Sequence, residues 1–507
     1  MKKKAMLIFL FIVTINATGQ VNGRIEENNG KQVLTVWGTH AERGYAHGYL
    51  VGQGIKDIFD NYIVNYLCQG SSLAYQNLRN FFLAYYSIEP KYRSEAEALI
   101  RGMRDNGISL SNQIIGRDID AEDVLICSAL PDLSQTSKGL EKMKLGCSSI
   151  SSWGTSTLQD TSLASQLIIT RLMDWDNHFA LCQNHLLIVH IPAEEDEQRW
   201  ISLAFSGFLG SLSGINESGI GAFMNVGNKT EFITDSLFYP ILFTLRNGIE
   251  MRDYNLDSSS DTDDILDAVR QRNRSAAAII HTVVNLGNDS DPMIIECNNV
   301  KGVIIRKRTN NTVVQGENLL ATNHFRLLYT PESCNRYSGV ADSLQNNVNI
   351  SPSRSWTILT DAAGVGWNLH GIQYNESARE LKWATSTVSI PAYLQSPSVF
   401  DLDDLFYPET GVIEAISTTE QQFNLAQNYP NPFNPTTSIR YDIPKASQVT
   451  LTIYNMNGQV VERPVNQKQE PGFYSVNWDA RNVSTGVYFY QIRAEGFQQV
   501  KKMLLIK

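Results

Sequence analysis

The 507-residue sequence has little cysteine, no excess of positive charge and only one long apolar run. Its six cysteines are too few and too scattered for a disulfide scaffold, and none forms a Cys-x-x-Cys pair suited to zinc or redox chemistry. Lys and Arg number 42 against 52 Asp and Glu, a net charge of -10 that repels a phosphate backbone. We therefore expect no nucleic-acid partner, no metal and no cofactor in a globular chain of two or three domains.

The one long apolar run lies at the N-terminus. A lysine-rich start precedes an apolar stretch from Ala5 to about Ile15, and the small residues Ala17 and Gly19 follow it. This pattern predicts a secretory signal peptide at residues 1–19, because a membrane-spanning helix needs roughly 20 apolar residues. No other segment reaches that length, so we expect an exported chain with no transmembrane segment after the signal peptide is removed.

Hydrophobic periodicity changes along the chain. Amphipathic helical stretches predominate from about residue 24 to 144, the longest from Ala41 to Leu67. After Gly146, short β-branched runs separated by Gly, Asn and Ser predict antiparallel sheets. We expect two helical stretches between Asp261 and Val284 to interrupt these strands, and a strand from Thr357 to Thr360. Strand layers flanked by helices predict an α+β sandwich.

The composition shifts again beyond Leu405, where a polar stretch predicts a linker at residues 405–422. Alternating strands such as Gln448 to Tyr454 and Gly486 to Arg493 then predict a small two-sheet, Ig-like β-sandwich. The expected division is a signal peptide at 1–19, a helical region at 20–146, a catalytic core at 147–404, the linker, and a C-terminal domain at 423–507.

A candidate nucleophile stands where helices give way to strands, in Leu145-Gly146-Cys147-Ser148-Ser149. Its thiol can attack the preceding carbonyl, and hydrolysis of the ester-like intermediate leaves Cys147 with a free α-amine. Gly146 favours this step because glycine permits a strained turn with no Cβ in the path of attack. The amine, with an ordinary pKa of about 7.7 to 8.0, can then serve as the base for its own thiol. A lone Gly-Cys-Ser is otherwise most simply a small buried hydrophobe.

Two later segments carry side chains that suit this chemistry. Arg171 and Asp174, after an expected hairpin, can favour the thiolate and orient the new amine, although a surface ion pair is the simpler interpretation of these two alone. Asn225 lies at the end of an expected strand, where its side-chain amide can donate to a developing oxyanion. Capping of a turn is an equal alternative for that asparagine.

Five segments in order, over roughly residues 33–386, together resemble the penicillin (isopenicillin N) acyltransferase family. They are Gly38-Thr39-His40-Ala41-Glu42-Arg43-Gly44-Tyr45-Ala46-His47-Gly48, Gly146-Cys147, Arg171-Leu172-Met173-Asp174-Trp175, Ile215 to Asn225, and Ala321-Thr322-Asn323-His324-Phe325. The resemblance implies the αββα N-terminal-nucleophile fold, self-cleavage between Gly146 and Cys147 into two chains that stay together, and acyl transfer through a thioester on Cys147.

The wider superfamily includes bile salt hydrolases and acid ceramidase-like amidases, and the resemblance carries its functional residues onto this chain. The matching positions are Cys147 as nucleophile, Arg171, Asp174, Asn225 as oxyanion donor, Asn323 as a second active-site asparagine, and Arg336, with Arg354 as its alternative. Ser148 stands where the family often has threonine. Because the resemblance assigns the base to the Cys147 amine, we do not expect His40, His47 or His324 to form a Cys-His dyad or a metal site.

The C-terminal segment carries a second resemblance. The run Asn428-Tyr429-Pro430-Asn431-Pro432-Phe433-Asn434-Pro435-Thr436-Thr437, with Trp478-Asp479-Ala480 and the basic end from Lys501 to Lys507, is similar to type IX secretion sorting domains of Gram-negative bacteria. This implies export across both membranes, secretion machinery as a partner, and release or attachment to the cell surface. An adhesion or carbohydrate-binding domain is the alternative, but no aromatic platform for sugars is evident.

The sequence thus predicts a secreted, self-cleaving cysteine amidohydrolase or acyltransferase that acts on a small N-acyl amide or acyl thioester. A phospholipase B-like or ceramidase-like hydrolase of lipids is an enzymatic alternative. A catalytically silent surface protein that kept the fold as a binding module is the alternative from another class.

Overall fold

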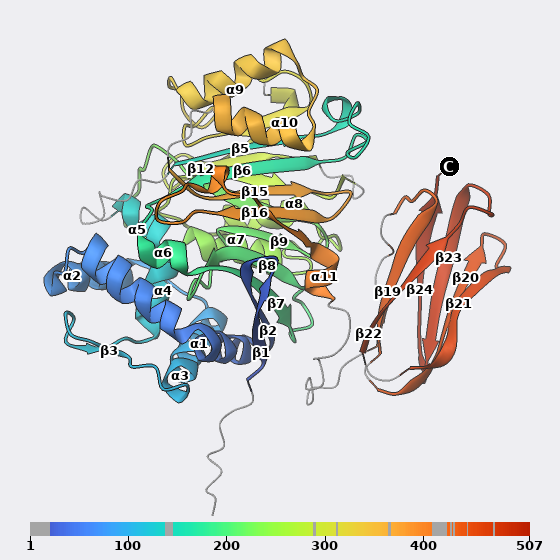
Figure 1. Ribbon diagram of the computed structural model, residues 1–507, viewed down its shortest axis with the longest axis horizontal. Coiled ribbons are helices and arrows are strands. Elements are labelled where there is room, and N and C mark those ends of the chain that lie inside the picture. The colour runs from blue at the N-terminus through green and yellow to red at the C-terminus, as the bar shows by residue number, and fades with distance from the viewer. Residues whose placement is uncertain are drawn as a thin grey trace, which may run out of the picture.

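Two β-sheets lie face to face in the main part of the chain (Figure 1). The structure is a computed structural model that describes residues 21–136, 146–286, 291–310, 313–362, 367–407, 423–425, 428, 431–443, 445–469 and 472–506. The predicted signal peptide and most of the predicted linker lie outside these residues.

The first sheet is nine-stranded, and its neighbouring strands are antiparallel except for one parallel pair, β2 with β7. Its order is β1 (Gly23–Asn28), β2 (Lys31–Gly38), β7 (His185–Pro192), β8 (Trp200–Phe205), β9 (Ser213–Asn216), β10 (Gly221–Val226), β11 (Ala278–Val283), β12 (Ile294–Asn298) and β13 (Gly302–Arg306). Strand β8 is buried on both faces: Ile201 and Leu203 pack between the sheets, and Trp200 packs toward the helices.

The second sheet is six-stranded and antiparallel throughout. Its order is β14 (Asn318–Ala321), β5 (Gly146–Ser152), β6 (Ile168–Asp174), β15 (Asn368–Asn375), β16 (Glu380–Thr385) and β17 (Ser398–Asp401). An apolar core between the two sheets includes Phe223 and Ile279 of the first sheet and Ile169 and Ile372 of the second.

Helices cover the outer face of each sheet. The first sheet packs against α1 (His40–Asp57), η1 (Ile58–Leu67), α2 (Ser72–Tyr85), α3 (Pro90–Asp105), α4 (Ala121–Ser128), α5 (Leu130–Thr136), α6 (Phe179–Gln183), α7 (Ile241–Glu250) and α8 (Thr262–Gln271). The second sheet is covered by α9 (Asn335–Asn346), α10 (Pro352–Thr357) and η5 (Ile358–Ala362), which lie above β5 and β6 in Figure 1. The order helix, sheet, sheet, helix agrees with the predicted α+β sandwich.

Helices α1 and α3 pack unusually closely. Helix α1 begins after Thr39, whose hydroxyl and the Glu42 carboxylate form a capping box. Gly44 and Gly48 face α3, and a Cβ on either residue would lie 2.1 Å from the Glu95 carbonyl oxygen or 1.9 Å from that of Leu99. Glycine is therefore required at both positions for the two backbones to approach, which explains Gly44 and Gly48 of the Gly38–Gly48 segment.

The C-terminal segment forms two sheets around a core of its own. One sheet has β18 (Asn424–Leu425), β19 (Thr436–Ile443) and β22 (Gly472–Asp479). The other has β21 (Val460–Gln469), β20 (Ser447–Asn455), β23 (Gly486–Ala494) and β24 (Phe497–Leu505). Ile439 and Trp478 from the first sheet pack with Leu451 and Tyr490 from the second.

Two predictions of secondary structure were wrong. The second helical stretch expected before Val284 is strand β11, because its β-branched residues are buried in the sheet on both faces and packing overrides the helical preference of the preceding alanines. Thr357 to Thr360 is helical, because α10 begins at Pro352 and the Ser351 hydroxyl caps it.

The packed core extends a little beyond residue 404, where the sequence predicted the catalytic core to end. Helix α11 (Leu402–Phe406) buries Leu405 and Phe406 in the core between the sheets, so the packed core continues past that residue. In the part of the chain that the structure describes, no helix combines the length and the apolar character that crossing a membrane requires.

Candidate active site

Strand β5 places Cys147 between the two sheets. Alternate residues of a strand face opposite sides. Ser149 and Ser151 face the first sheet and contact His281 on β11, while Ile150 packs on the helices behind the second sheet. Cys147 shares the face of Ser149, and it is buried beside Arg171 of the neighbouring strand β6.

Arg171 lies at the centre of a cluster that it forms with Cys147, Ser213, Met224 and Asn225. Its Nη2 lies 3.5 Å from Cys147 Sγ and also donates to the Met224 carbonyl, and its Nη1 donates to Ser213 Oγ at 2.6 Å. Its Nε donates to Asn225 Oδ1 at 3.4 Å. The side chain is fully buried, and no carboxylate of the described residues forms an ion pair with it. Burial lowers the pKa of this guanidinium, which nevertheless stays protonated at neutral pH.

Arg336, at the start of α9, holds the backbone around the nucleophile. Its Nη1 donates to the Cys147 carbonyl at 3.2 Å and to Asp174 Oδ2 at 3.1 Å, and its Nη2 donates to Asn323 Oδ1 at 2.5 Å. Arg354 instead donates to the carbonyls of Ser343 and Asn347. Of Arg336 and Arg354, Arg336 is therefore the one that the fold brings to Cys147.

Asn323 holds the nitrogen of Cys147. Its Oδ1 accepts the Cys147 N–H at 2.8 Å, and its Nδ2 donates to the Val226 carbonyl at 2.8 Å. Asp174 is predicted to orient the amine that cleavage would free; in the uncut chain its carboxylate lies beside Gly146, and its Oδ1 accepts no hydrogen bond from the described residues. Burial raises the pKa of Asp174 to about 6, although Arg336 and Arg171 oppose the shift.

Gly146 lies close to Asp174. Its backbone does not adopt the left-handed conformation that favours glycine, so the strained turn expected there is absent. A Cβ at this position would lie 2.7 Å from Asp174 Oδ2, so a side chain would force the carboxylate to shift. Glycine therefore serves to let the chain pass close to Asp174.

Asn225, the second-last residue of β10, is buried and faces the second sheet. Its Oδ1 lies 3.4 Å from Arg171 Nε, and its Nδ2 lies 3.5 Å from the Thr322 carbonyl oxygen. Hydrogen bonds of these lengths are weak. The Asn225 NH2 therefore remains able to donate to a closer acceptor.

The Cys147 thiol is neutral in this arrangement. Burial raises its pKa, and the neighbouring Arg171 and Arg336 only partly oppose that effect. Among the described hydrogen bonds, no histidine contacts the thiol. A base is therefore needed beside the sulfur before it can react.

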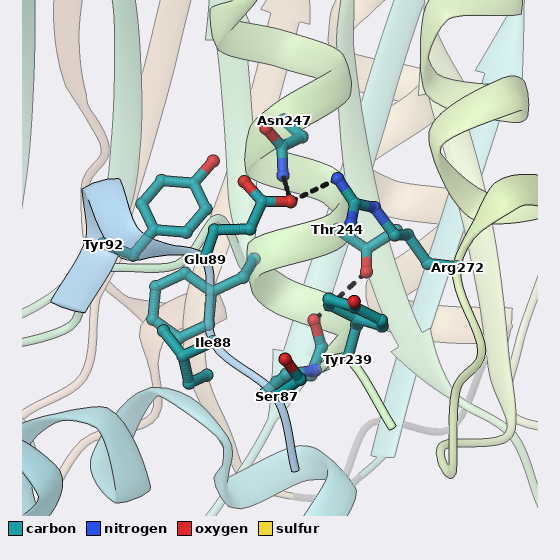
Figure 2. Close-up of a pocket in the computed structure, with 10 residues that line it drawn as sticks. Ser87, Ile88, Glu89, Tyr92, Tyr239, Thr244, Asn247 and Arg272 are labelled. Atoms are coloured by element: carbon teal, nitrogen blue, oxygen red, sulfur yellow. Dashed lines mark hydrogen bonds and ion pairs between the residues drawn. The ribbon is translucent and has the colours of Figure 1, made fainter. Parts of the chain in front are cut away.

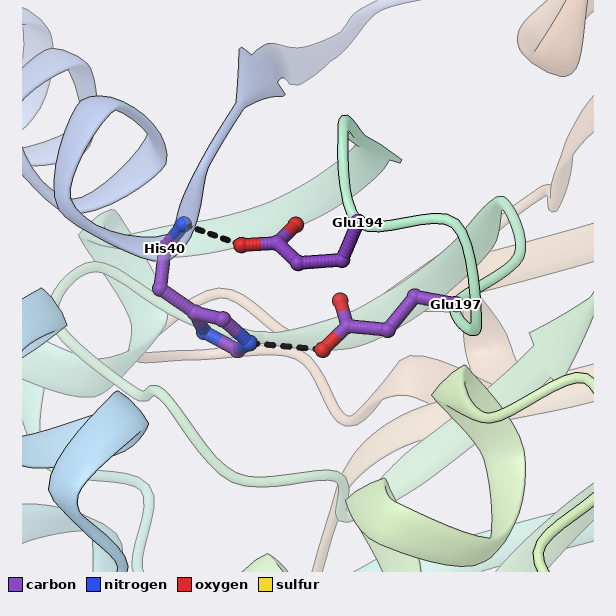
Figure 3. A group of neighbouring side chains, drawn as sticks. All are labelled: His40, Glu194 and Glu197. Atoms are coloured by element: carbon purple, nitrogen blue, oxygen red, sulfur yellow. Dashed lines mark hydrogen bonds and ion pairs between the residues drawn. The ribbon is translucent and has the colours of Figure 1, made fainter.

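The histidines near the N-terminus have structural partners. His47 accepts a hydrogen bond from the Gly207 N–H at 3.0 Å, and burial lowers its pKa to about 4. His40 lies with Glu194 and Glu197 in a group that has the donor atoms for a metal ion (Figure 3). Its two ring nitrogens, however, contact the carboxylates of Glu95 and Glu197, each at 2.7 Å.

Cations balance the carboxylates around His40. Arg43 pairs with Glu197 at 2.7 Å, and Arg246 pairs with Glu95 and Glu250 at the same distance. Two carboxylate contacts on one ring require both nitrogens to carry a proton, so His40 is the imidazolium of a buried ion network. Although burial acts in the opposite direction, the hydrogen bonds to Glu197 and Glu95 raise its pKa.

The His40 network predicts a pH-dependent stability. Because the folded pKa is raised, the contribution of His40 is fully present below the unfolded pKa of about 6.5 and is lost as pH rises through the folded pKa. In denaturant titrations, the difference in unfolding free energy between wild type and His40→Gln should become smaller as the pH is raised from about 6 to about 9. His178→Gln, which removes a histidine whose pKa burial lowers, should show no such narrowing. A difference in unfolding free energy between wild type and His40→Gln that does not change with pH would show that the His40 ring is neutral.

A small pocket lies on the helical side of the first sheet (Figure 2). It is lined by the segment from Ser87 to Glu89, by α7 and by Arg272, and Asn247 donates to Glu89 at 3.0 Å inside it. None of its lining residues belongs to the cluster around Cys147.

Comparison with known families identifies the C-terminal module. A model described as the secretion system C-terminal sorting domain matches residues 427–507. The C-terminal module is a type IX secretion sorting domain. This confirms the predicted sorting domain and indicates export of the chain to the medium or the cell surface. The sorting domain also indicates that the chain engages secretion machinery.

Solved structures similar to the chain include two hydrolases. A Caenorhabditis elegans ortholog of N-acylethanolamine-hydrolyzing acid amidase is 13% identical, with a TM-score of 0.35 over 50% of this chain and 100% of that one. A mutant of the conjugated bile acid hydrolase of Clostridium perfringens is 11% identical, with a TM-score of 0.32 over 50% of this chain and 93% of that one. Protein dcd1B of Dictyostelium discoideum is 20% identical over 229 residues, which are 41% of this chain and 40% of that protein. The chain thus spans about 40% of the length of this curated relative.

Proposed function

We propose that the chain is an exported cysteine amidohydrolase or acyltransferase of the N-terminal-nucleophile type, which cuts itself before Cys147 and then carries acyl groups on that thiol. The observation that carries the proposal is the buried cation of Arg171, 3.5 Å from Cys147 Sγ and unpaired with any described carboxylate. A buried charge is unfavourable without a counter-ion. A thiolate or a tetrahedral oxyanion beside Arg171 would supply that counter-ion during the reaction.

Self-cleavage exchanges one acyl bond for another. The Cys147 sulfur adds to the Gly146 carbonyl carbon, the C–N bond breaks, and the nitrogen takes the proton that the thiol gives up. Water then adds to the thioester, which releases the Gly146 carboxylate and leaves Cys147 with a thiol and an α-amine. Asn323 at the Cys147 nitrogen and Arg336 at its carbonyl support this step, because they hold the backbone of the reacting residue on both sides.

In turnover, the new amine takes the proton from its own thiol, and the thiolate attacks the acyl carbon of the substrate. Asn225 Nδ2 and the Arg171 guanidinium stabilise the resulting oxyanion. The amine product leaves, and water or a second amine then takes the acyl group from the thioester. Asn323 Oδ1 and the unoccupied Asp174 Oδ1 are the acceptors available to orient the amine of Cys147.

The substrate class that suits this site is a small N-acyl amide or acyl thioester. A thiolate with a neighbouring oxyanion donor acts on an acyl carbon, and no metal or cofactor takes part in the steps above. A silent binding module would gain nothing from an uncompensated buried arginine, which would only destabilise its fold.

A substrate screen tests this proposal. Purified protein would be incubated with N-acyl amides of increasing acyl length, quenched in acid, and searched by mass spectrometry for an acyl group on the peptide that begins at Cys147. We expect amine release together with an acylated Cys147, and neither with Cys147→Ala. Amide hydrolysis that survives in Cys147→Ala would place the reaction elsewhere in the molecule.

A further inference from the structure

The side chain of His281 makes a polar contact across the apolar layer between the two sheets, with strand β5, which carries Cys147. His281 lies on β11 of the first sheet, and its ring reaches β5 of the second. Its Nδ1 lies 2.9 Å from Ser149 Oγ and its Nε2 lies 2.7 Å from Ser151 Oγ. All three side chains are fully buried, and Ile279 and Phe223 nearby belong to the apolar core.

Apolar packing alone does not fix how far one sheet slides over the other, because hydrophobic contact has no preferred direction. Hydrogen bonds, in contrast, have a preferred direction. A single ring that bonds two serines two residues apart defines the position of β5 along its own axis. Cys147 is the next residue on the same face, so its sulfur is placed by the same contact.

The first sheet carries the oxyanion donor beside His281. Strand β10 pairs with β11, with Phe223 opposite His281 and Asn225 opposite Ile279. The contact of His281 with β5 therefore fixes where Cys147 lies along the direction of its strand, relative to Asn225 on β10. Arg171, bonded to Ser213 and the Met224 carbonyl, is a second cross-link between the sheets at this place.

We propose that His281 is a positioning residue, which holds the Cys147 strand in register with the strand of Asn225 through Ser149 and Ser151; this role rests on the proposed function. The ring has no contact with Cys147 among the described hydrogen bonds. Burial lowers the pKa of His281 to about 3, so the neutral ring donates to one serine and accepts from the other. It orients the strand and transfers no proton to substrate.

The test compares two buried histidines of the first sheet. His281→Phe keeps a planar aromatic ring, of somewhat larger volume, and removes both bonds to β5. His190→Phe is the control, because His190 is also fully buried but stacks on Trp200, with ring centroids 4.1 Å apart, on the helical side of the sheet. Melting temperature, the extent of self-cleavage, kcat and KM would be measured for both variants.

We expect His281→Phe to lower kcat about tenfold or more with KM within about twofold, since a small misplacement of reacting atoms is enough for such a loss. His190→Phe should lose stability while kcat stays within about twofold of wild type. If His281→Phe does not fold, Ser149→Ala and Ser151→Ala each remove one bond, and each should lower kcat severalfold without changing KM.

Equal kcat values for His281→Phe and His190→Phe, in a protein whose wild type cuts itself and acylates Cys147, would overturn the positioning role alone. A wild-type kcat in both Ser149→Ala and Ser151→Ala would also overturn the positioning role alone. A wild type that neither cuts itself nor acylates Cys147 would overturn the proposed function, and this role with it.

Discussion

Cys147→Ala should remain a single chain and show no detectable turnover. Without the sulfur, no thioester can form at Gly146 or on a substrate, and the neighbouring Arg171 has no anion to stabilise. Denaturing electrophoresis and an N-acyl amide assay measure the two losses separately.

A matched control for that variant is Cys297→Ala. Cys297 is also buried, on β12, and takes no part in the contacts around Cys147. It should be cut and active, so a loss shared by both variants would point to damage of the fold. Cleavage of Cys147→Ala at the normal site would contradict the role of the thiol.

Asn225→Ala should lower kcat about a hundredfold or more with little change in KM, the result expected when an oxyanion donor is removed. The Asn225 NH2 makes only a weak contact, of 3.5 Å, with the Thr322 carbonyl, so the substitution removes a donor that is available to the transition state and breaks no strong hydrogen bond of the fold. Kinetics on cut and folded protein give the decisive values. Self-cleavage should slow as well, because the Gly146 carbonyl passes through a similar tetrahedral species.

Asn216→Ala is the matched control for Asn225→Ala. Asn216 is also buried, but its amide donates to the Ile249 carbonyl of α7 at 3.0 Å and accepts from the Ile220 N–H of the following turn at 2.9 Å, so both of its polar groups have structural partners. It should lower the melting temperature and leave kcat near wild type. Near-normal turnover of Asn225→Ala would show that Asn225 is a structural residue too.

Local sequence signals predicted the elements well. The helical stretch predicted from Ala41 to Leu67 and the strand that begins at the Gly146-Cys147 junction are present in the structure. These segments have clear hydrophobic periods and side-chain caps, such as Thr39 with Glu42. One exception is β11, where a run of alanine, isoleucine and valine carries no period that separates a buried strand from a helix. The other is Thr357 to Thr360, where the sequence predicted a strand and the chain is helical.

Long-range contacts of the site could not be read from spacing. Nothing near Asn323 indicates that its side chain accepts the Cys147 N–H from 176 residues away. The choice between Arg336 and Arg354 likewise depended on how α9 and α10 pack over β5, since both arginines follow Asn323. Ser213, which accepts a hydrogen bond from Arg171, carried no sequence signal.

The central claim is self-cleavage, and intact-mass measurement with N-terminal sequencing of purified protein tests it most directly. The account predicts two chains that separate only under denaturing conditions. The smaller, residues 20–146, should have a mass of about 14 kDa, and the larger should begin at Cys147. A single uncut chain that hydrolyses N-acyl amides at full rate would contradict the account.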